Sequence, residues 1–355
     1  MPKRIFNSML KRKKQPYKRI NLPSKVIIGK KVLEKASEFI EGYNGILVVT
    51  GKKTEKIAGK KVSKVVDSER FIITEPRYSE VKKLISEVKA QEVDLIFACG
   101  GGKIIDVSKL AAFQAGIDFV SIPTNCSNDG ISSPIASLYF NGHRQSLVAK
   151  PPIGVIADIK IIKKSPYRFI ASGFGDAIAK YSAVRDWSLG HVIKGEYYGD
   201  YASSLSLMVA KMVMNNAYEI RKRTERGLNV LLEALISSGA AMGIAGSSRP
   251  ASGSEHKFSH ALDLILKKPN LHGLQVGLGT IVMSYLQGNN WEKVRNALEV
   301  AKCPTTAKKL GVTSSQVLEA MLKAKEIKPE RYTIIEHLKL DRHTALKALE
   351  STGVI

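Results

Sequence analysis

The sequence predicts an α/β domain with a parallel, Rossmann-like sheet over residues 26–165, followed by an all-α domain over residues 166–355. Two observations support this fold class. Up to about residue 158, short runs rich in β-branched residues alternate with helical stretches, which is the pattern of βαβ units. After Ser165-Pro166 those runs stop, and helical segments follow one another with Pro and Gly between them. The 355 residues are also more than one core usually fills.

The predicted elements can be placed in chain order. In the first domain, strands are expected at 45–50, 93–98, 117–122 and 153–157, with helices at 80–90 and 103–115 between them. In the second domain, helices are expected at 203–223, 226–245, 255–267, 274–287, 290–301, 315–325 and 341–351. The two domains meet near residue 165 of the chain, and small-molecule sites are preferentially found at the interface between such domains, so a site is expected at that interface.

The composition excludes several other classes of protein. With 44% hydrophobic residues, the chain has enough apolar material to fold, which excludes a mainly disordered protein. The longest apolar run, at 276–286, contains glycines and is far shorter than the roughly 20 residues of a membrane span. The three cysteines, Cys99, Cys126 and Cys303, are too widely spaced for a thiolate zinc site or a disulfide framework. We therefore expect a cytoplasmic protein without a transmembrane segment.

The net charge is strongly positive, because 55 Lys and Arg face 32 Asp and Glu, a difference of +23. Eight of these cations lie in the first 19 residues, in a basic N-terminal extension, 1–25, that lacks the apolar core of a signal peptide. Such an extension is either a solvated tail or a contact for nucleic acids and anionic surfaces. Because Lys is spread along the whole chain and aromatic residues are only 7%, nucleic acid is not the expected partner.

Three consecutive glycines, 100–102, follow a predicted strand and precede Lys103 and a helix that carries Asp106. Glycines let a backbone approach a ligand closely, and a helix N-terminus offers N–H groups and a positive dipole end to a phosphate. The GxGxxG fingerprint is absent, because Ile105 stands where it needs Gly, and the segment is not a Walker loop either. The glycines indicate a phosphate-binding turn, with a plain tight turn as the alternative.

A polar loop follows the next predicted strand, and its residues 121–130 include Thr124, Ser127 and Asp129. Open α/β sheets bind ligands beyond the carboxyl ends of their parallel strands, which is where this loop lies. The loop therefore indicates a second part of a ligand site, unless it is simply an exposed polar connection.

Three of the seven histidines, His256, His260 and His272, fall within 17 residues. His256 and His260 are four residues apart on one face of a predicted helix, and His272 opens the next helix. This spacing favours a metal site, whereas packed or capping histidines are the alternative. The missing anionic ligand is best sought at Asp176, at a predicted helix start after two glycines, where a simple N-cap is the other interpretation.

Four stretches carry a resemblance to a known family: 100–106, 122–134, 172–176 and 247–260, which read GGGKIID, IPTNCSNDGISSP, SGFGD and SSRPASGSEHKFSH. From about Val26 to its last residue, the chain resembles the archaeal sn-glycerol-1-phosphate dehydrogenases. Their superfamily also holds glycerol dehydrogenase, iron-type alcohol dehydrogenases and 3-dehydroquinate synthase. The glycine and metal elements are shared across that superfamily, whereas SRPASGSEH is particular to the glycerol-phosphate branch. The N-terminal extension lies outside the pattern.

The resemblance implies a dehydroquinate synthase-like fold and a role for each matching residue. Asp176, His256 and His272 would bind the metal, which would be zinc or else iron(II). His260 would act in catalysis beside the metal, and Asp129 would be the substrate-side carboxylate. The nicotinamide cofactor, NADP or NAD, would be bound by the turn and the loop that follows the next strand: Gly100, Gly101, Gly102, Lys103, Asp106, Thr124 and Ser127.

The reaction implied by the resemblance is the reduction of dihydroxyacetone phosphate to sn-glycerol 1-phosphate, which supplies the backbone of archaeal membrane lipids. The chemistry agrees, since two imidazoles and one carboxylate leave zinc an open position at which it can polarise a carbonyl. Binding the substrate phosphate requires cations, for which Arg249 and Lys180 are the candidates, with Lys150 a weaker one. Glycerol oxidation and dehydroquinate synthesis are the alternative reactions. A homo-oligomer is expected.

The sequence also bears on the choice of cofactor. Enzymes that bind the 2′-hydroxyl of NAD usually place an acidic residue near a strand end, yet residues 45–54 contain none. Instead the segment presents Thr50, Lys52 and Lys53, which favours contact with the 2′-phosphate of NADPH.

Overall fold

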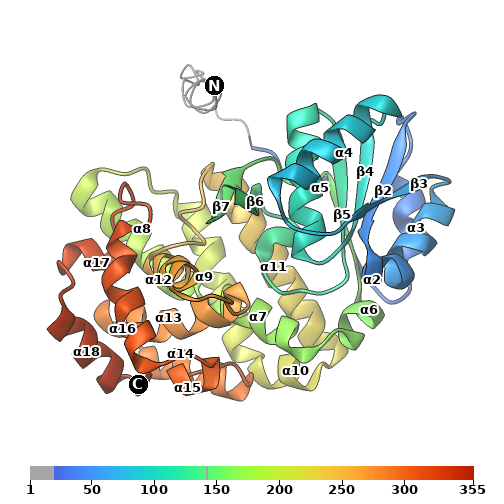
Figure 1. Ribbon diagram of the computed structural model, residues 1–355. Helices are drawn as coiled ribbons and strands as arrows, with labels where there is room; N and C mark the ends of the chain where they lie inside the picture. The colour runs from blue at the N-terminus through green and yellow to red at the C-terminus, as the bar shows by residue number, and fades with distance from the viewer. Residues whose placement is uncertain (1–19, 141–142) are drawn as a thin grey trace.

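The computed structural model describes residues 20–140 and 143–355. The predicted basic extension, residues 1–25, lies outside these described residues except for 20–25. Figure 1 shows a sheet flanked by helices in the first part of the chain and a region made of helices in the second. The predicted fold class is therefore confirmed.

The sheet contains six parallel strands in the order β1-β8-β5-β4-β2-β3. Their bounds are β1 (Lys25–Gly29), β2 (Ile46–Gly51), β3 (Glu69–Ile73), β4 (Leu95–Gly100), β5 (Asp118–Pro123) and β8 (Gly154–Asp158). Four of the six, β2, β4, β5 and β8, were predicted to within two residues. The two edge strands, β1 and β3, were not predicted, because their partly exposed residues form only short apolar runs.

The two faces of the sheet are both covered, which is why its central strands are continuously apolar. Along β4, Leu95 and Phe97 pack on one side and Ile96 and Ala98 on the other, as the alternation of a strand requires. One face is covered by α4 (Tyr78–Ala90) and α5 (Gly102–Ala115). The other is covered by the 3-10 helix η1 (Val32–Phe39), the π-helix η2 (Glu55–Gly59) and α3 (Lys60–Val65), whereas the short α2 (Lys52–Thr54) buries none of its residues.

Between β5 and β8 the chain leaves the sheet and forms structure that was not predicted. A 3-10 turn, η3 (Asp129–Ile131), is followed by an antiparallel hairpin of β6 (Ile135–Phe140) and β7 (His143–Val148). Because this excursion starts at the carboxyl end of β5, it stands at the edge of the sheet where ligands bind in open α/β folds.

After β8 the described chain forms helices only. They are α6 (Ile159–Lys164), α7 (Tyr167–Ile178), α8 (Lys180–Lys194), α9 (Asp200–Asn215), α10 (Ala217–Lys222), α11 (Glu225–Ala245), α12 (Ser254–Ile265), α13 (His272–Leu286), α14 (Trp291–Val300), α15 (Ala307–Leu310), α16 (Ser314–Lys323), η4 (Ala324–Glu326), α17 (Ile334–His337) and α18 (Arg342–Ser351). The predicted helix 203–223 is in fact two helices, because the backbone leaves the helical conformation at Asn216.

The segment before residue 200 corrects a second prediction. Asp176 was expected at the start of a helix, but it lies in the last turn of α7, and α8 begins only at Lys180. An N-cap role for Asp176 is therefore wrong. Gly173 and Gly175, which suggested a helix start, are inside α7, where they allow other backbone segments to approach the helix.

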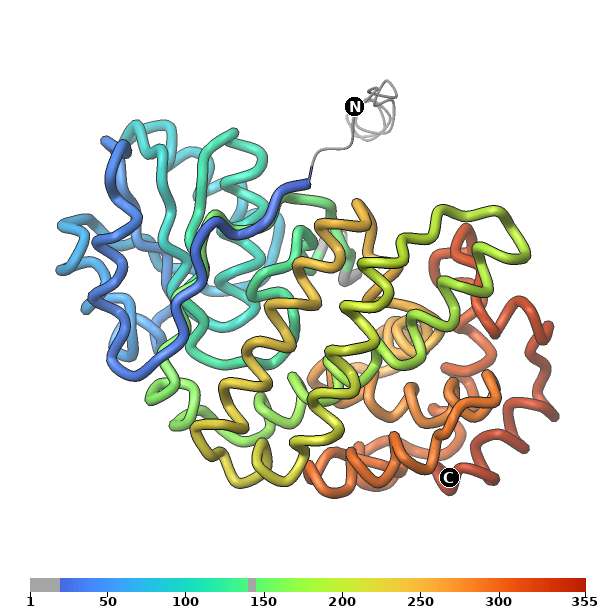
Figure 2. The backbone as a smooth tube through the Cα atoms, turned by 180° about the vertical axis from the view of Figure 1, so that it is seen from behind, coloured from blue at the N-terminus to red at the C-terminus, as the bar shows by residue number. Residues whose placement is uncertain are grey.

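Helix α11 lies at the boundary between the sheet and the other helices, where Figure 2 shows it from behind. Within the described ranges, α11 is the helix that has the length and apolar composition of a membrane span, but half of that apolar stretch is buried inside the protein. It packs against α9, α7 and η3, which is how a core helix of a globular protein behaves. The apolar core is continuous across this boundary, from the α5 side of the sheet into the helices.

Candidate active site

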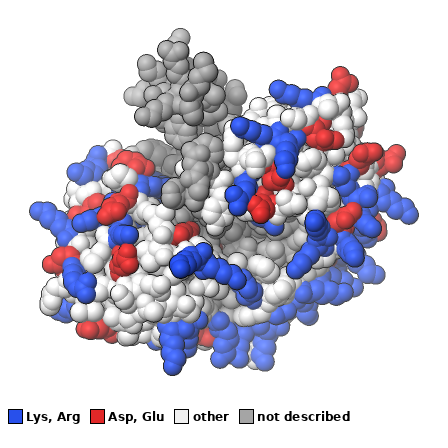
Figure 3. All heavy atoms as spheres, viewed as in Figure 1, with Lys and Arg blue, Asp and Glu red and all other residues white. Residues whose placement is uncertain are grey.

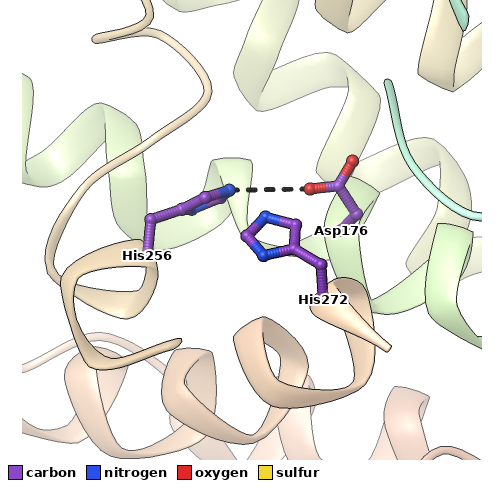
Figure 4. Close-up of side chains that lie close together, drawn as sticks. All are labelled: Asp176, His256 and His272. Carbon is purple, nitrogen blue, oxygen red and sulfur yellow. Dashed lines mark ion pairs between the residues drawn. The ribbon is translucent and has the colours of Figure 1, made fainter. Parts of the chain in front are cut away.

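Three side chains that were predicted as metal ligands converge in the structure. Asp176 of α7, His256 of α12 and His272 of α13 offer ligand atoms that all lie within 4.8 Å of one another. Figure 4 shows the three side chains facing one another from three different helices. Asp176 and His256 are buried, and His272 is partly buried.

Glycines bring the helices of this cluster together. A Cβ atom at Gly175 would lie 2.1 Å from the carbonyl oxygen of Gly273, and one at Gly273 would lie 1.8 Å from that of Ser172. Only hydrogen fits at these positions, so α7 and the first turn of α13 touch backbone to backbone. The Ser172 hydroxyl accepts the Gly273 N–H and donates to the carbonyl of Ser127, which joins the polar loop to the same contact.

The Asp176 carboxylate is held by groups on both sides. Its Oδ2 accepts the backbone N–H of Asp129 at 2.8 Å, and its Oδ1 lies 3.2 Å from Lys180 Nζ and 3.6 Å from His256 Nε2. Burial opposes ionisation, but Lys180 and the two histidines prevail and hold the pKa of Asp176 well below its usual range. The carboxylate is therefore an anion, as a metal ligand must be.

A second carboxylate orients one of the histidines. His256 Nδ1 lies 2.8 Å from Oε1 of Glu255, which is fully buried and also accepts the N–H of Gly253. Burial favours neutral groups, yet the hydrogen bond to His256 lowers the pKa of Glu255, so this carboxylate is ionised. A carboxylate acceptor at Nδ1 leaves Nε2 facing Asp176, the arrangement typical of metal-binding histidines.

These residues fit a divalent metal ion. Two imidazoles and one carboxylate, with converging ligand atoms, form the set found in catalytic zinc sites and in iron(II) sites with open coordination positions. Because the donors are nitrogen and carboxylate oxygen only, the set is compatible with both zinc and iron(II).

A cavity of about 500 Å³ opens beside the cluster. This volume is ordinary for a small-molecule site. His256, His260 and His272 line it from the helical region, and Asp106 and Asp129 from the side of the sheet. The cavity therefore lies between the two regions, as expected of a site at their interface.

His260 lies in this cavity but outside the cluster of ligand atoms. It is on the next turn of α12 after His256, and its ring centroid is 5.6 Å from that of His272. Burial lowers the pKa of His260, an effect that the ion-pair partner Asp263 opposes. This position is consistent with the expected role beside the metal.

Two of the cations predicted to bind a substrate phosphate are paired elsewhere. Lys180 is fully buried, and its Nζ lies 2.9 Å from Oδ2 of Asp129 and 3.2 Å from Oδ1 of Asp176. Arg249 pairs with Glu196 at 2.8 Å and donates to two backbone carbonyls, outside the lining of the cavity. Both charges are therefore neutralised by carboxylates of the protein.

Three further residues of the predicted site line the cavity. Lys150 lines the cavity but pairs with Asp118 at 2.7 Å. Asp129 also lines it and accepts the hydroxyl of Ser238 at 2.7 Å. Asp106 lines it as well, 3.2 Å from the buried amine of Lys109.

The glycine turn has the expected geometry. Gly100 ends β4, and α5 begins at Gly102. A Cβ atom at Gly101 would lie 2.5 Å from the Asn125 amide nitrogen, and the Thr124 N–H donates to the carbonyl of Gly100. The turn and the polar loop that contains Thr124 and Ser127 are therefore neighbours at one edge of the sheet.

The predicted cofactor-binding side chains near the ends of β2 and β3 differ in their exposure and in their partners. The Thr50 hydroxyl is buried and donates to the carbonyl of Cys99, whereas Lys52 is exposed at the start of α2. Lys103 donates to the carbonyl of Thr74 at the end of β3. Of these, Lys52 is the one whose side chain is left open to a ligand.

The sequence did not reveal the roles of Glu255, Lys328 and Arg331. Glu255 precedes His256 in the chain, but no pattern in the sequence marks it as the acceptor for that imidazole. Lys328 and Arg331 line the cavity from the segment after η4, far along the chain from the other site residues. No periodicity or motif marks that segment, so only the folded structure identifies it.

Known proteins resemble this chain in fold, and some of them also in sequence. Residues 27–166 match the family model of iron-containing alcohol dehydrogenases. Solved structures with the same fold include a probable glycerol dehydrogenase from Sinorhizobium meliloti 1021, with a TM-score of 0.79 at 19% identity, covering 94% of this chain and 98% of that one. Glycerol dehydrogenase from Schizosaccharomyces pombe has a TM-score of 0.74 at 18% identity, covering 96% and 94%.

Much closer sequences are found among curated archaeal proteins named glycerol-1-phosphate dehydrogenase (NAD(P)+). That of Pyrococcus furiosus is 49% identical over 343 residues, which cover 95% of this chain and 99% of the relative. That of Methanosarcina mazei is 43% identical, covering 91% and 93%. With nearly half of its residues identical over almost its whole length, the chain belongs to the glycerol-1-phosphate dehydrogenase family.

Proposed function

We propose that this protein reduces dihydroxyacetone phosphate to sn-glycerol 1-phosphate with NADPH or NADH. The observation that carries the proposal is the identity of 49% over 95% of the chain to a glycerol-1-phosphate dehydrogenase. The convergence of Asp176, His256 and His272 at a cavity next to the glycine turn supports it. The product would enter the biosynthesis of membrane lipids.

The metal would be held by Asp176, His256 and His272. A bound zinc or iron(II) ion would act as a Lewis acid toward the carbonyl group of the substrate. Around it, the chain supplies the positioning: Glu255 orients His256, and Lys180 joins the carboxylates of Asp129 and Asp176.

The nicotinamide cofactor would bind at the edge of the sheet and supply the hydride. Its pyrophosphate fits the turn of Gly100, Gly101 and Gly102, where missing side chains and the N-terminus of α5 favour a phosphate. Further contacts are proposed for residues of the turn, the polar loop and the end of β2: Lys103, Asp106, Thr124, Ser127, Thr50 and Lys52.

The proton that completes the reduction is assigned to His260. Its ring lines the cavity beside His272, and an imidazole can shuttle a proton. His260 would deliver this proton to the reduced carbonyl oxygen, directly or through water, while Asp129 orients the hydroxyl group of the substrate.

The organisation of the chain follows from these roles. Residues 26–165 are proposed as the dinucleotide-binding domain and residues 166–355 as the metal- and substrate-binding domain. A cytoplasmic homo-oligomer is proposed. Figure 3 shows Lys and Arg along the lower edge of one face, with Asp and Glu interspersed elsewhere, and a positive field of this kind attracts phosphorylated substrates and cofactors.

The test is NADPH consumption by the purified protein. We expect turnover with dihydroxyacetone phosphate, little turnover with unphosphorylated dihydroxyacetone, and loss of activity on chelation that zinc or iron(II) restores. Chiral analysis should identify the product as sn-glycerol 1-phosphate. A preference for the unphosphorylated ketone would favour a glycerol dehydrogenase, and activity that survives complete metal removal would contradict the role of the metal.

A further inference from the structure

Two cations that no motif identified lie in the wall of the cavity. Lys328 and Arg331 come from the segment between η4 and α17, and both line the cavity together with His256 and His260. In the described ranges, neither side chain forms an ion pair with a carboxylate. Lys180, Arg249 and Lys150, by contrast, are each paired with an acidic residue.

The guanidinium group of Arg331 is held in place by uncharged acceptors. It donates to the backbone carbonyl of Ser252 and to the Ser248 hydroxyl, which belong to the loop before α12. Because α12 carries His256 and His260, this loop connects the guanidinium group to the helix that holds one of the predicted metal ligands. These two hydrogen bonds use only some of the five guanidinium N–H groups, so other donors remain available to a ligand.

The position of Lys328 is set by a local turn. Its carbonyl accepts the N–H of Arg331 at 2.8 Å, and its φ of 47° is in the left-handed region that few residues other than Gly adopt. The turn brings the two cations to the same wall of the cavity, although an extended chain would separate their side chains.

The electrostatics of the pair favour the binding of an anion. Burial and the neighbouring Arg331 lower the pKa of Lys328 to about 8, although Glu330 acts in the opposite direction. Burial and Arg249 likewise lower the pKa of Arg331. Two neighbouring cations in a partly buried site repel each other, and a bound anion removes that cost.

We propose that Lys328 and Arg331 form the subsite for the phosphate group of the substrate, and so determine its specificity for a phosphorylated ketone. The subsite rests on the proposed function, since it presupposes such a substrate. Its location fits, because the phosphate of dihydroxyacetone phosphate is only a CH₂–O unit away from the carbonyl carbon. The cofactor pyrophosphate, by comparison, belongs to the glycine turn on the sheet.

The first test is a comparison of Lys328→Gln and Arg331→Gln with the wild type. Each change should raise the KM for dihydroxyacetone phosphate by about 10- to 100-fold, the usual effect of losing a hydrogen bond to a charged group. The KM for NADPH and the residual kcat/KM for unphosphorylated dihydroxyacetone should stay within about twofold. Equal losses with both ketones, or an unchanged KM for the phosphorylated one, would overturn the proposal.

Lys325→Gln is the matched control, because it removes the same charge from an exposed residue of η4. It should leave all of these constants unchanged. Metal content is measured for every variant, so that a disturbed cluster is recognised. Arg331→Lys should recover only part of the lost affinity, since a lysine lacks the planar pair of donors.

The second test does not require turnover. With NADP+ saturating, inorganic phosphate should raise the melting temperature of the wild type, and Lys328→Gln and Arg331→Gln should abolish that shift. If the wild type fails to reduce dihydroxyacetone phosphate but phosphate still stabilises it through these residues, the proposed function fails and the subsite stands. If phosphate stabilises the wild type and both variants equally, or none of them, the subsite is refuted.

Discussion

His256 Nδ1 lies 2.8 Å from Oε1 of Glu255, the residue that precedes it on α12. Both side chains point inward, because Glu255 is fully buried and His256 is nearly so. A residue next to a metal ligand in sequence thus acts as its hydrogen-bond acceptor, and the orientation of the imidazole depends on a carboxylate that does not itself belong to the ligand cluster.

Glu255→Gln should weaken metal binding. The amide is a poorer acceptor for the imidazole N–H, and losses of outer partners of this kind cost about 10- to 100-fold in metal affinity. Competition with a chelator measures the affinity. Glu326→Gln, which changes an exposed carboxylate in η4, is the control and should bind metal as the wild type does. Equal affinities for wild type and Glu255→Gln would show that the hydrogen bond has no such role.

Gly273→Ala should destabilise the fold and the metal site together. The added methyl group would lie 1.8 Å from the carbonyl oxygen of Ser172, so α7 and α13 must move apart. Overpacking of this kind costs about 1–3 kcal/mol, measurable as the free energy of unfolding in urea. At Gly102 the nearest atom to an added Cβ is 3.6 Å away, so Gly102→Ala is the steric control and should keep the stability of the wild type. Equal stability of the two variants would argue against the close contact.

Lys52→Ala should shift the cofactor preference. Lys52 is exposed at the start of α2, directly after β2, where the sequence predicted contact with the 2′-phosphate of NADPH. Removing this charge should raise the KM for NADPH by about tenfold and leave that for NADH unchanged. The exposed Lys56 of η2 provides the control substitution, Lys56→Ala. A wild type that turns over NADH as well as or better than NADPH would contradict the contact.

The KM for dihydroxyacetone phosphate should rise above about pH 8. Burial and Arg331 lower the pKa of Lys328 to about 8, so in the free enzyme the amine loses its charge as the pH rises through that value. Only the ammonium form binds a phosphate well, and the KM should increase by up to about tenfold per pH unit above the pKa.

The control for this pH effect is the Lys328→Gln variant. Because it has no amine to titrate at this position, its KM for dihydroxyacetone phosphate should stay constant from about pH 7 to about pH 9.5. The charged or titratable groups near Lys328 are Arg331, Glu330 and His260, and of these Lys328 is the one whose pKa is expected near 8. The same rise in wild type and variant would assign the titration to another group.

Local patterns in the sequence were sufficient for part of the structure. The strands β2, β4, β5 and β8 were found because central strands of a parallel sheet are continuous apolar runs, and His256, His260 and His272 were placed correctly because helical spacing is local. The edge strands β1 and β3 and the hairpin β6–β7 were missed, since partly exposed strands lack that signal.

The position of Asp176 within its helix could not be predicted from the neighbouring residues alone. Two glycines before an acidic residue suggested a helix start, whereas Gly175 is needed for the contact of α7 with Gly273. The same residues satisfy both interpretations in sequence. Only the packing partner, on a helix about 100 residues later, distinguishes them.

By itself, the sequence determined the fold class, the glycine turn and the histidine cluster, because each depends on residues close together in the chain. Asp176, which is distant from the histidines in sequence, was joined to them by the resemblance to a known family. The tertiary structure decided which charges are available. Lys180 and Arg249 are neutralised by carboxylates from other segments, whereas Lys328 and Arg331 reach the cavity without such partners in the described part of the chain. The physical reason is that the availability of a charge depends on its neighbours in space, and those neighbours are set by packing.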